Sequence, residues 1–364
     1  MRPLRIVHTE SSLGWGGQEI RVLTEARGVA RQGHEVLLAA PAESRIHREA
    51  PRFGVASQAL PIGRKGLASV AAMRGLLAQR PFDVVNTHSS TDSWVVAVAR
   101  ASSAAKPAIV RTRHISAPVP RNFATRWLYG QARRIVTTGE KLREQVIEET
   151  GVAPELVVSV PTGIDLERFA PGDRAAARRT TGLSADKLVV GIVATLRSWK
   201  GHRYLIEAIA AMARADVELA IVGDGPQREA LEAQARGAGI ATRFAGDQDD
   251  VAPWLQSFDL FCLPSYANEG VPQALMQAMA CGLPVITTDV GSIGEIVTGG
   301  VTGVMVRPED AGAIRVAVEA LLQDEAKRRA LGSAAASRAR ERFGEQRMVE
   351  RMIAAFEAAR SGGA

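Results

Sequence analysis

The chain has 364 residues, of which 46 % are hydrophobic and 23 % are charged, and this composition excludes a disordered, collagen-like or disulfide-scaffold protein. Its two cysteines, Cys262 and Cys281, form no C-x-x-C pair, which excludes a structural zinc site built from thiolates. The net charge of +6 is uneven, because residues 1–165 carry 22 basic and 14 acidic side chains, whereas residues 166–364 carry 23 and 25.

Short apolar runs alternate with helical segments through the first half of the chain. This alternation predicts a parallel, doubly wound sheet. Gly33 is expected to end the first helix. The expected strands are residues 4–8, 35–40, 83–87, 108–113 and 156–160, and the expected helices are residues 18–32, 67–79 and 93–100.

The second half repeats the same alternation. Its first expected strand, residues 187–195, is almost continuously apolar, as a strand covered on both faces should be. The other expected strands are residues 217–222, 260–263 and 284–287, and the expected helices are residues 204–214, 227–238, 272–281 and 310–322, followed by one long helical tail over 326–359.

A linker is predicted in residues 163–186, where Pro171, Gly172 and a polar cluster interrupt the pattern. The fold class is therefore α/β, with two Rossmann-like, doubly wound parallel-sheet domains that face a cleft. We expect them to span residues 1–167 and 168–345, and we expect residues 346–364 to form a C-terminal helix that returns toward the first domain. Ligands of such folds bind at the carboxyl ends of the strands.

No apolar run reaches the ~18 residues that a membrane-spanning helix needs. The first residues lead directly into a strand and leave no room for a signal peptide, so a cytoplasmic, reducing location is expected. The basic first half favours an anionic partner: phosphate, a membrane surface or nucleic acid. Nucleic acid is the least favoured, because no basic stripe is interleaved with aromatic residues.

A glycine-rich loop follows the first expected strand. Gly16 and Gly17 would let backbone amides approach an anion at the start of the next helix. A nicotinamide dinucleotide is disfavoured, because Glu19 occupies the place of the third glycine and the second strand ends without an acidic residue. The alternative is that the glycines form only a turn.

Two further loops in the second half carry candidate chemistry. Arg197 and Lys200 lie three residues apart just past a strand and can both reach one diphosphate, although two solvated surface charges would fit the pattern equally well. Glu269, Gly270 and Val271 precede a helix that starts near Pro272, and their amides lie at its positive end. Without other information, Glu269 is also a plausible helix-start acid.

These stretches resemble the retaining family 4 glycosyltransferases, which have the two-Rossmann-domain GT-B fold. The resemblance covers nearly the whole chain, is specific from about residue 160 to residue 310, and is looser before that. It is carried by residues 161–169, 197–201, 221–226, 269–285 and 291–297, and by the glycine loop at residues 16–19.

The resemblance implies a donor site for a nucleoside-diphosphate sugar in the second domain. Arg197 and Lys200 would bind its diphosphate, and Gly16 and Gly17 would close on it from the first domain. Because the donor is a substrate, no cofactor is implied.

Glu269 corresponds to the first acid of the family's E-x7-E motif, which contacts the transferred sugar, with Gly270 and Val271 beside it. Gln277 stands where the second Glu normally holds the ribose hydroxyls, and a Gln accepts such a hydrogen bond without charge assistance. No metal is expected, because the D-x-D spelling at residues 247–249 fits a charged turn better than a metal site.

On the acceptor side, the resemblance implies that the first domain binds the acceptor. His114 resembles the family's active-site histidine, and His88, Arg111 and Arg113 are the candidate acceptor residues. The arginines near residues 111–134, interrupted by Phe123 and neighbouring aromatic residues, are the candidate acceptor or membrane surface.

The expected function is metal-independent, retaining transfer of a hexosyl or related group from a nucleoside-diphosphate sugar. The expected acceptor is a cell-surface polysaccharide, lipopolysaccharide or lipid-linked glycan, handled in the cytoplasm or at the inner face of an anionic membrane. The alternatives are a sugar-nucleotide epimerase on the same scaffold and a non-catalytic nucleotide-sugar-binding subunit, which Gln277 favours.

Overall fold

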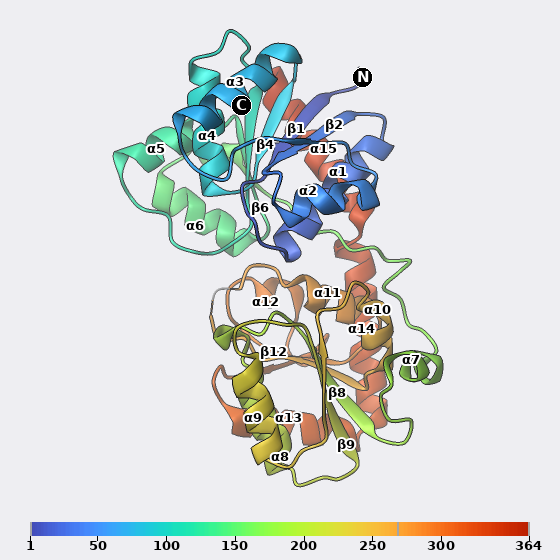
Figure 1. Ribbon diagram of the computed structural model, residues 1–364. Helices are drawn as coiled ribbons and strands as arrows, with labels where there is room; N and C mark the ends of the chain where they lie inside the picture. Colours follow the sequence, from blue (N-terminus) through green and yellow to red (C-terminus); the bar gives the residue numbers. More distant parts are fainter. Residues whose placement is uncertain (1, 268, 363–364) are drawn as a thin grey trace. The chain divides into compact units, whose positions relative to one another are not determined.

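The computed structural model describes residues 2–267 and 269–362. It divides into two compact units (Figure 1). One unit contains the chain up to Gly163 and again from Glu345 onward, and the other is Ile164–Gly344. The chain therefore passes from one unit to the other at 163–164 and at 344–345, whereas the sequence placed these boundaries at 167–168 and 345–346.

The first unit is built on a seven-stranded parallel sheet with the order β3-β2-β1-β4-β5-β6-β7. Its strands are β1 (Arg5–Thr9), β2 (Glu35–Ala40), β3 (Ser57–Ala59), β4 (Val84–Thr87), β5 (Ala108–Arg113), β6 (Arg134–Thr137) and β7 (Val157–Ser159). Its helices are α1 (Gly17–Arg31), α2 (Arg45–Glu49), α3 (Leu67–Gln79), α4 (Ser90–Ala101), α5 (Phe123–Gly130), α6 (Glu140–Thr150) and α15 (Glu345–Ser361).

Alternate residues of these strands face opposite sides of the sheet. Ile6 and Val84 belong to the core beneath α15, together with Phe356 of that helix. Val7 and Val85 point to the other side, where α3, α4, α5 and α6 cover the sheet. Figure 1 shows the C-terminal helix α15 beside α1. Burial on both faces explains why these strands read as apolar runs.

The second unit has a six-stranded parallel sheet with the order β10-β9-β8-β11-β12-β13. Its strands are β8 (Leu188–Val193), β9 (Val217–Val222), β10 (Thr242–Gly246), β11 (Leu260–Leu263), β12 (Val285–Thr288) and β13 (Val304–Val306). Its helices are α7 (Arg174–Thr181), α8 (His202–Ala211), α9 (Arg228–Gly237), α10 (Ala252–Ser257), α11 (Gln273–Ala280), α12 (Ile293–Ile296), α13 (Ala311–Gln323) and α14 (Glu325–Arg342).

The strand order reverses at one place in each sheet: between β1 and β4 in the first unit, and between β8 and β11 in the second. At such a point the connections leave toward opposite sides, and a crevice opens beyond the carboxyl ends of the two strands. The fold class predicted from the sequence is confirmed, and each unit has one such switch point to hold a ligand.

Two expectations about the second half were wrong. The predicted linker contains helix α7, which Asp173 starts by accepting hydrogen bonds from the amides of Ala175 and Ala176. The predicted single tail helix is two helices, α14 and α15. The chain leaves the helical path at Phe343, which is buried in the second unit's core and whose carbonyl accepts the amide of Ile164. Tertiary packing at Phe343 outweighs the local helix propensity.

In the described part of the chain, no helix combines the length and the apolar character that crossing a membrane requires.

Candidate active site

Arg197 and Lys200 lie on a short 3-10 turn, Ser198–Lys200, that follows β8 at the switch point of the second unit. Arg197 is exposed, its guanidinium stands 5.7 Å from the centre of the Trp199 ring, and it forms no ion pair with any residue that the structure describes. Lys200 is half-buried and points toward the loop after β11. The turn therefore presents one unneutralised cation beside a second that is already held in place.

Glu269 is the partner of Lys200. The Lys200 Nζ donates to Glu269 Oε1 over 2.6 Å, and the Ser265 hydroxyl donates to the same oxygen over 2.6 Å. The Glu269 residue is only 4 % exposed, so this carboxylate is fixed by its partners rather than by water. The structure thus brings together Lys200 and Glu269, both predicted from the sequence, from the loops after two neighbouring strands at the switch point. Arg197 lies on the same turn as Lys200.

Close backbone contacts hold the turn after β8 against the loop after β11. The Tyr266 amide donates to the Trp199 carbonyl over 2.8 Å and joins the loop after β11 to the turn after β8. Gly201 has a φ of +76°, and a Cβ there would lie 2.0 Å from the Pro264 carbonyl oxygen. Only glycine fits between these two loops, and this explains how Lys200 reaches the carboxylate.

Gly270 and Val271, both half-buried, lead into α11, and Pro272 is the N-cap of that helix rather than its first residue. Gln277 lies in the second turn of α11 and is also half-buried. Along the chain, the backbone amides of Gly270 and Val271 come first, and the neutral amide side chain of Gln277 follows in the second turn of α11.

The glycine loop of the first unit follows β1, and Gly16 is the N-cap of α1 in an extended conformation, with Gly17 exposed as the first helical residue. The loop is held by Glu10, whose carboxylate accepts from the Ser12 amide over 2.9 Å and from Gln18 Nε2 over 2.6 Å. The Ser89 hydroxyl also donates to Glu10. Buried Glu10 therefore ties Ser12, before the glycines, to Gln18, just after them.

His88 follows β4 and His114 follows β5, near the β1–β4 switch point of the first unit. His88 Nδ1 lies 2.9 Å from His114 Nε2, and His88 Nε2 lies 3.0 Å from Nδ1 of His8, a residue of β1 that the sequence did not single out. Burial lowers the pKa of His88 and His114 well below the usual value, and the positive charge of Arg21 acts in the same direction. Both rings are therefore neutral near pH 7.

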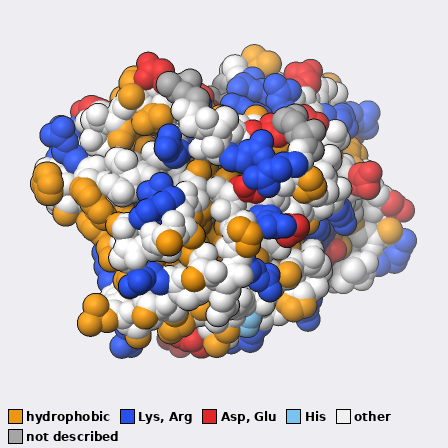
Figure 2. Space-filling view, turned by 90° about the horizontal axis from the view of Figure 1, so that it is seen from above, with side chains coloured by type: hydrophobic (Ala, Val, Ile, Leu, Met, Phe, Trp, Pro, Cys, Tyr) orange, Lys and Arg blue, Asp and Glu red, His pale blue; other side chains and the backbone are white. Residues whose placement is uncertain are grey.

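Arg111 and Arg113 do not share one surface. Arg111 is 6 % exposed, stacks 4.6 Å from the centre of the Tyr129 ring, and leaves Nε and Nη1 without a hydrogen-bond partner. Arg113 is half-buried and donates to the Ala117 carbonyl. On the face that Figure 2 draws, Lys and Arg side chains form several separate groups. The surface expected around residues 111–134 is wrong in this respect, because the Arg111 side chain packs inside the unit.

Comparison with known proteins identifies the family. Residues 15–168 match the family described as "Glycosyltransferase Family 4", and residues 187–324 match "Glycosyl transferases group 1". A "D-inositol 3-phosphate glycosyltransferase" of Geodermatophilus obscurus is 32 % identical over 305 residues, which cover 76 % of this chain and 67 % of that protein. The chain belongs to glycosyltransferase family 4.

Solved structures share the fold of this glycosyltransferase. Anabaena Alr3699/HepE in complex with UDP-glucose has a TM-score of 0.83 at 22 % identity and covers 96 % of this chain and 98 % of its own. The lipopolysaccharide outer core galactosyltransferase WaaB, in its apo form, has a TM-score of 0.71 at 17 % identity and covers 97 % and 99 %. At these identities the likeness shows the GT-B fold alone.

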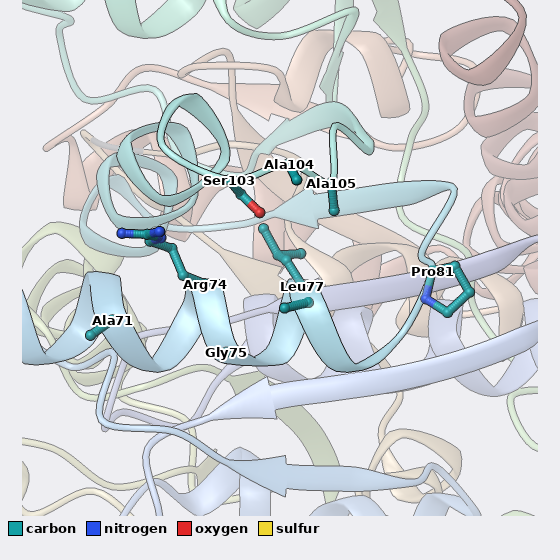
Figure 3. A pocket seen from close by; sticks show the side chains of 9 residues that line it. Ala71, Arg74, Gly75, Leu77, Pro81, Ser103, Ala104 and Ala105 are labelled. Carbon is teal, nitrogen blue, oxygen red and sulfur yellow. The ribbon is translucent and has the colours of Figure 1, made fainter.

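A separate pocket of about 670 Å³ lies in the first unit of the glycosyltransferase, between α3 and the loop after α4 (Figure 3). Leu77, Pro81 and small residues form most of its wall, and Arg74 is its one charged lining residue. It contains none of the residues predicted to act on the substrate, so its size does not mark the active site.

Sequence reasoning missed four residues that organise the glycosyltransferase site: His8, Glu10, Asp92 and Ser265. Asp92 accepts from the amides of His88 and Ser89 and caps α4. The Ser89-x-x-Asp92 spacing is the signature of a capping box and could have identified this residue. His8 carries no local signal, because its partner His88 follows another strand. Ser265 and Glu10 do contact residues four to eight positions away, Glu269 and Gln18, but these spacings match no known motif.

Proposed function

We propose that this glycosyltransferase moves a sugar from a nucleoside-diphosphate donor to a hydroxyl of its acceptor, with retention at the anomeric carbon and without a bound metal. The observation that carries the proposal is the Lys200–Glu269 pair at the β8–β11 switch point, with the exposed cation of Arg197 on the same turn as Lys200. Two cations match a diphosphate, and the carboxylate can accept hydrogen bonds from sugar hydroxyls.

The reaction needs charge stabilisation. As the bond from the anomeric carbon to the phosphate oxygen breaks, negative charge grows on the diphosphate and positive charge on the sugar ring. Lys200, which Glu269 holds in place, is a donor fixed in advance of that change, and Arg197 supplies a second cation on the same turn. Preorganised donors supply much of the rate enhancement in many enzymes. Glu269 would hold the sugar hydroxyls and lie near the developing positive charge.

The retaining course assigns the remaining protons. The acceptor hydroxyl attacks on the face that the diphosphate leaves, and the departing phosphate oxygen takes the acceptor proton as the new glycosidic bond forms. His114 orients the sugar, and Gly16 and Gly17 give the phosphate close access to the start of α1. In this scheme no protein carboxylate forms a covalent bond to the sugar.

The decisive experiment incubates the protein with UDP-, GDP- and ADP-sugars, with and without an acceptor mixture. We expect acceptor-dependent release of the nucleoside diphosphate and a product that keeps the anomeric configuration. Acceptor-independent release of nucleotide would instead identify an epimerase. Binding of nucleotide with no release under either condition would identify a non-catalytic subunit.

Gln277→Glu should tighten nucleoside-diphosphate binding about fivefold, because a carboxylate accepts a ribose hydrogen bond about 1 kcal/mol more favourably than an amide does. Calorimetric titration with the preferred nucleotide measures the change. Gln273→Glu is the matched control, since it adds the same charge one turn earlier on α11 and should not tighten binding. Equal effects of the two changes would show that Gln277 does not contact the ribose.

We also propose a phosphate-bearing or lipid-linked acceptor, such as a lipopolysaccharide or polysaccharide intermediate, met at the inner face of an anionic membrane. The net +8 of residues 1–165 supports this, as do the names of two relatives, an inositol-phosphate and a lipopolysaccharide glycosyltransferase. The surface near α5 adds apolar anchors: Phe123 is 85 % exposed, and Trp127 stacks on Trp94.

In liposome flotation, the protein should bind phosphatidylglycerol-containing vesicles and should dissociate as salt rises, because screening weakens surface charge attraction. Phe123→Ser should reduce flotation. Val316→Ser, at a site in α13 that is 59 % exposed, is the control and should leave flotation unchanged. Equal flotation with neutral and anionic vesicles, or none with either, would rule out this docking mode.

A further inference from the structure

Three histidines form one continuous hydrogen-bonded chain across the first sheet. His8, His88 and His114 come from β1 and from the ends of β4 and β5, which are neighbours in the sheet. The His8 and His88 ring planes are only 8° apart with centroids separated by 5.3 Å, the geometry of an edge-to-edge contact between nitrogens. The chain runs from the buried interior of the unit toward half-buried His114.

Neutral imidazoles impose a strict condition on such a chain. Each neutral ring carries a hydrogen on one nitrogen and a lone pair on the other, and each contact needs one of each. Only two arrangements satisfy both contacts: every ring has its hydrogen on Nδ1, or every ring has it on Nε2. The tautomer of His8 therefore decides that of His114, two rings away.

The surroundings of His8 favour the hydrogen on Nδ1. Glu25 Oε1 lies 3.9 Å from His8 Nδ1 and accepts a hydrogen bond from Asn86 Nδ2 over 3.1 Å. Burial raises the pKa of Glu25 to about 7, and its ionised form places negative charge next to His8 Nδ1. Arg21 Nε lies 3.6 Å from the other Glu25 oxygen and forms an ion pair with this carboxyl group.

The surroundings of the other ring nitrogen, His8 Nε2, favour the same tautomer. His8 Nε2 is buried without a hydrogen-bond partner, and the ring stands at 84° to that of Phe356 with the two centroids 6.0 Å apart. A hydrogen on Nε2 would be an N–H buried with no acceptor, which is rarer and costlier than an acceptor without a donor. Both observations select the arrangement with every hydrogen on Nδ1.

We propose that His8 and His88 are positioning residues that hold His114 as the neutral tautomer with its hydrogen on Nδ1. Within residues 2–267 and 269–362 the structure gives His114 Nδ1 no hydrogen-bond partner, so this N–H is the end of the chain that a ligand can meet. His114 then donates to a sugar or phosphate oxygen and cannot act there as a general base. Only this last role rests on the proposed function.

The charged groups around the three histidines are compatible with this tautomer assignment. Glu25 and Arg21 of α1 face His8 and His88, Arg113 acts on His114, and Asp92 of α4 binds the His88 amide rather than its ring. Burial lowers the pKa of His8 to about 3, so this ring stays neutral through the range in which the protein is studied.

The test is nitrogen-detected NMR of the full chain with 15N-labelled histidine. The six histidines can be assigned with single variants, and long-range proton–nitrogen spectra separate the two tautomers directly. We expect His114 to show a protonated Nδ1 and an unprotonated Nε2, unchanged from pH 6 to pH 9. A hydrogen on Nε2 in the wild-type protein would overturn the proposal.

Two variants at one position separate positioning from a structural effect. His88→Leu removes the donor to His114 Nε2, so His114 should shift toward the Nε2–H tautomer that free histidine prefers. H88N places an amide N–H near the former Nδ1 and should retain the wild-type tautomer. His47→Gln, on helix α2, is the control and should leave the His114 signals unchanged. A wild-type tautomer in His88→Leu would also overturn the proposal.

An activity readout separates this proposal from the proposed function. With the preferred donor, His88→Leu should lower kcat about tenfold, which corresponds to about one hydrogen bond in the transition state, and H88N should lower it less than His88→Leu does. The spectra need no substrate, so the tautomer assignment can stand when no transferase activity is found. Conversely, transferase activity can be confirmed in a protein whose His114 carries the other tautomer.

Discussion

Lys200→Ala and Arg197→Ala should each lower kcat/KM by about 10²–10³, because each removes a preorganised cation from the diphosphate. The two variants should differ in their effect on stability. Arg197 is exposed and forms no ion pair with any described residue, so its removal should change donor handling without changing stability. Lys200 also holds Glu269, and its removal leaves a buried carboxylate with one positive partner fewer.

Steady-state kinetics with the preferred donor, together with thermal unfolding, measures both effects. We expect Lys200→Ala to lower the melting temperature as well as the activity, since breaking one side of a largely buried ion pair is destabilising. Adding Glu269→Gln to Lys200→Ala should restore part of the stability and none of the activity. Lys327→Ala, on the exposed side of α14, is the control for loss of charge alone. Near-wild-type donor turnover in both single variants would mean that these cations do not clamp the diphosphate.

Gly291→Ala should reduce activity by about 10² or more, because catalytic groups misplaced by about 1 Å lose rate on that scale. Gly291 follows β12 with a φ of +59°, and a Cβ there would stand 1.8 Å from the Glu269 carbonyl oxygen. The backbone that carries the Glu269 carboxylate must move to admit the methyl group. Activity should fall further than the change in stability alone explains.

Gly239→Ala is a matched control for that substitution. Its φ is +65°, and nothing lies within 4 Å of the added Cβ, so it introduces the same backbone strain without the collision. We expect it to cost about 1 kcal/mol of stability and to leave kcat/KM unchanged. Comparing the two variants by thermal unfolding and donor kinetics isolates the contact with Glu269. If both behaved alike, the position of Glu269 would not depend on Gly291.

The long elements of this fold could be predicted from the chain because their signals are local. The strand now seen as β8 is a run of apolar residues, and α1 ends where Gly33 was expected to stop it. Of the strands that escaped prediction, β3, β10 and β13 stand at sheet edges and contain no buried residue, and β6 has four residues. The break between α14 and α15 escaped as well, because burial of Phe343 decides it and no local stop signal does.

The candidate site divides in the same way. The loops that carry Gly16, Arg197 and Glu269 were predicted because glycine, clustered cations and a helix start are readable in a few consecutive residues. The residues that contact these loops in the folded structure could not be predicted from the sequence. Glu10 accepts from Ser89, which the sheet brings close, and Arg111 was expected at the surface although its guanidinium packs over the Tyr129 ring.

By itself, the sequence predicted two parallel α/β domains, since apolar periodicity and turn chemistry are properties of neighbouring residues. Its glycine, cation and glutamate loops resembled those of family 4 glycosyltransferases. Only the tertiary structure decided which of those loops meet. The Lys200–Glu269 pair joins residues 69 apart and the His8–His88 contact joins residues 80 apart. Both depend on the order of strands in a sheet, and long-range packing sets that order.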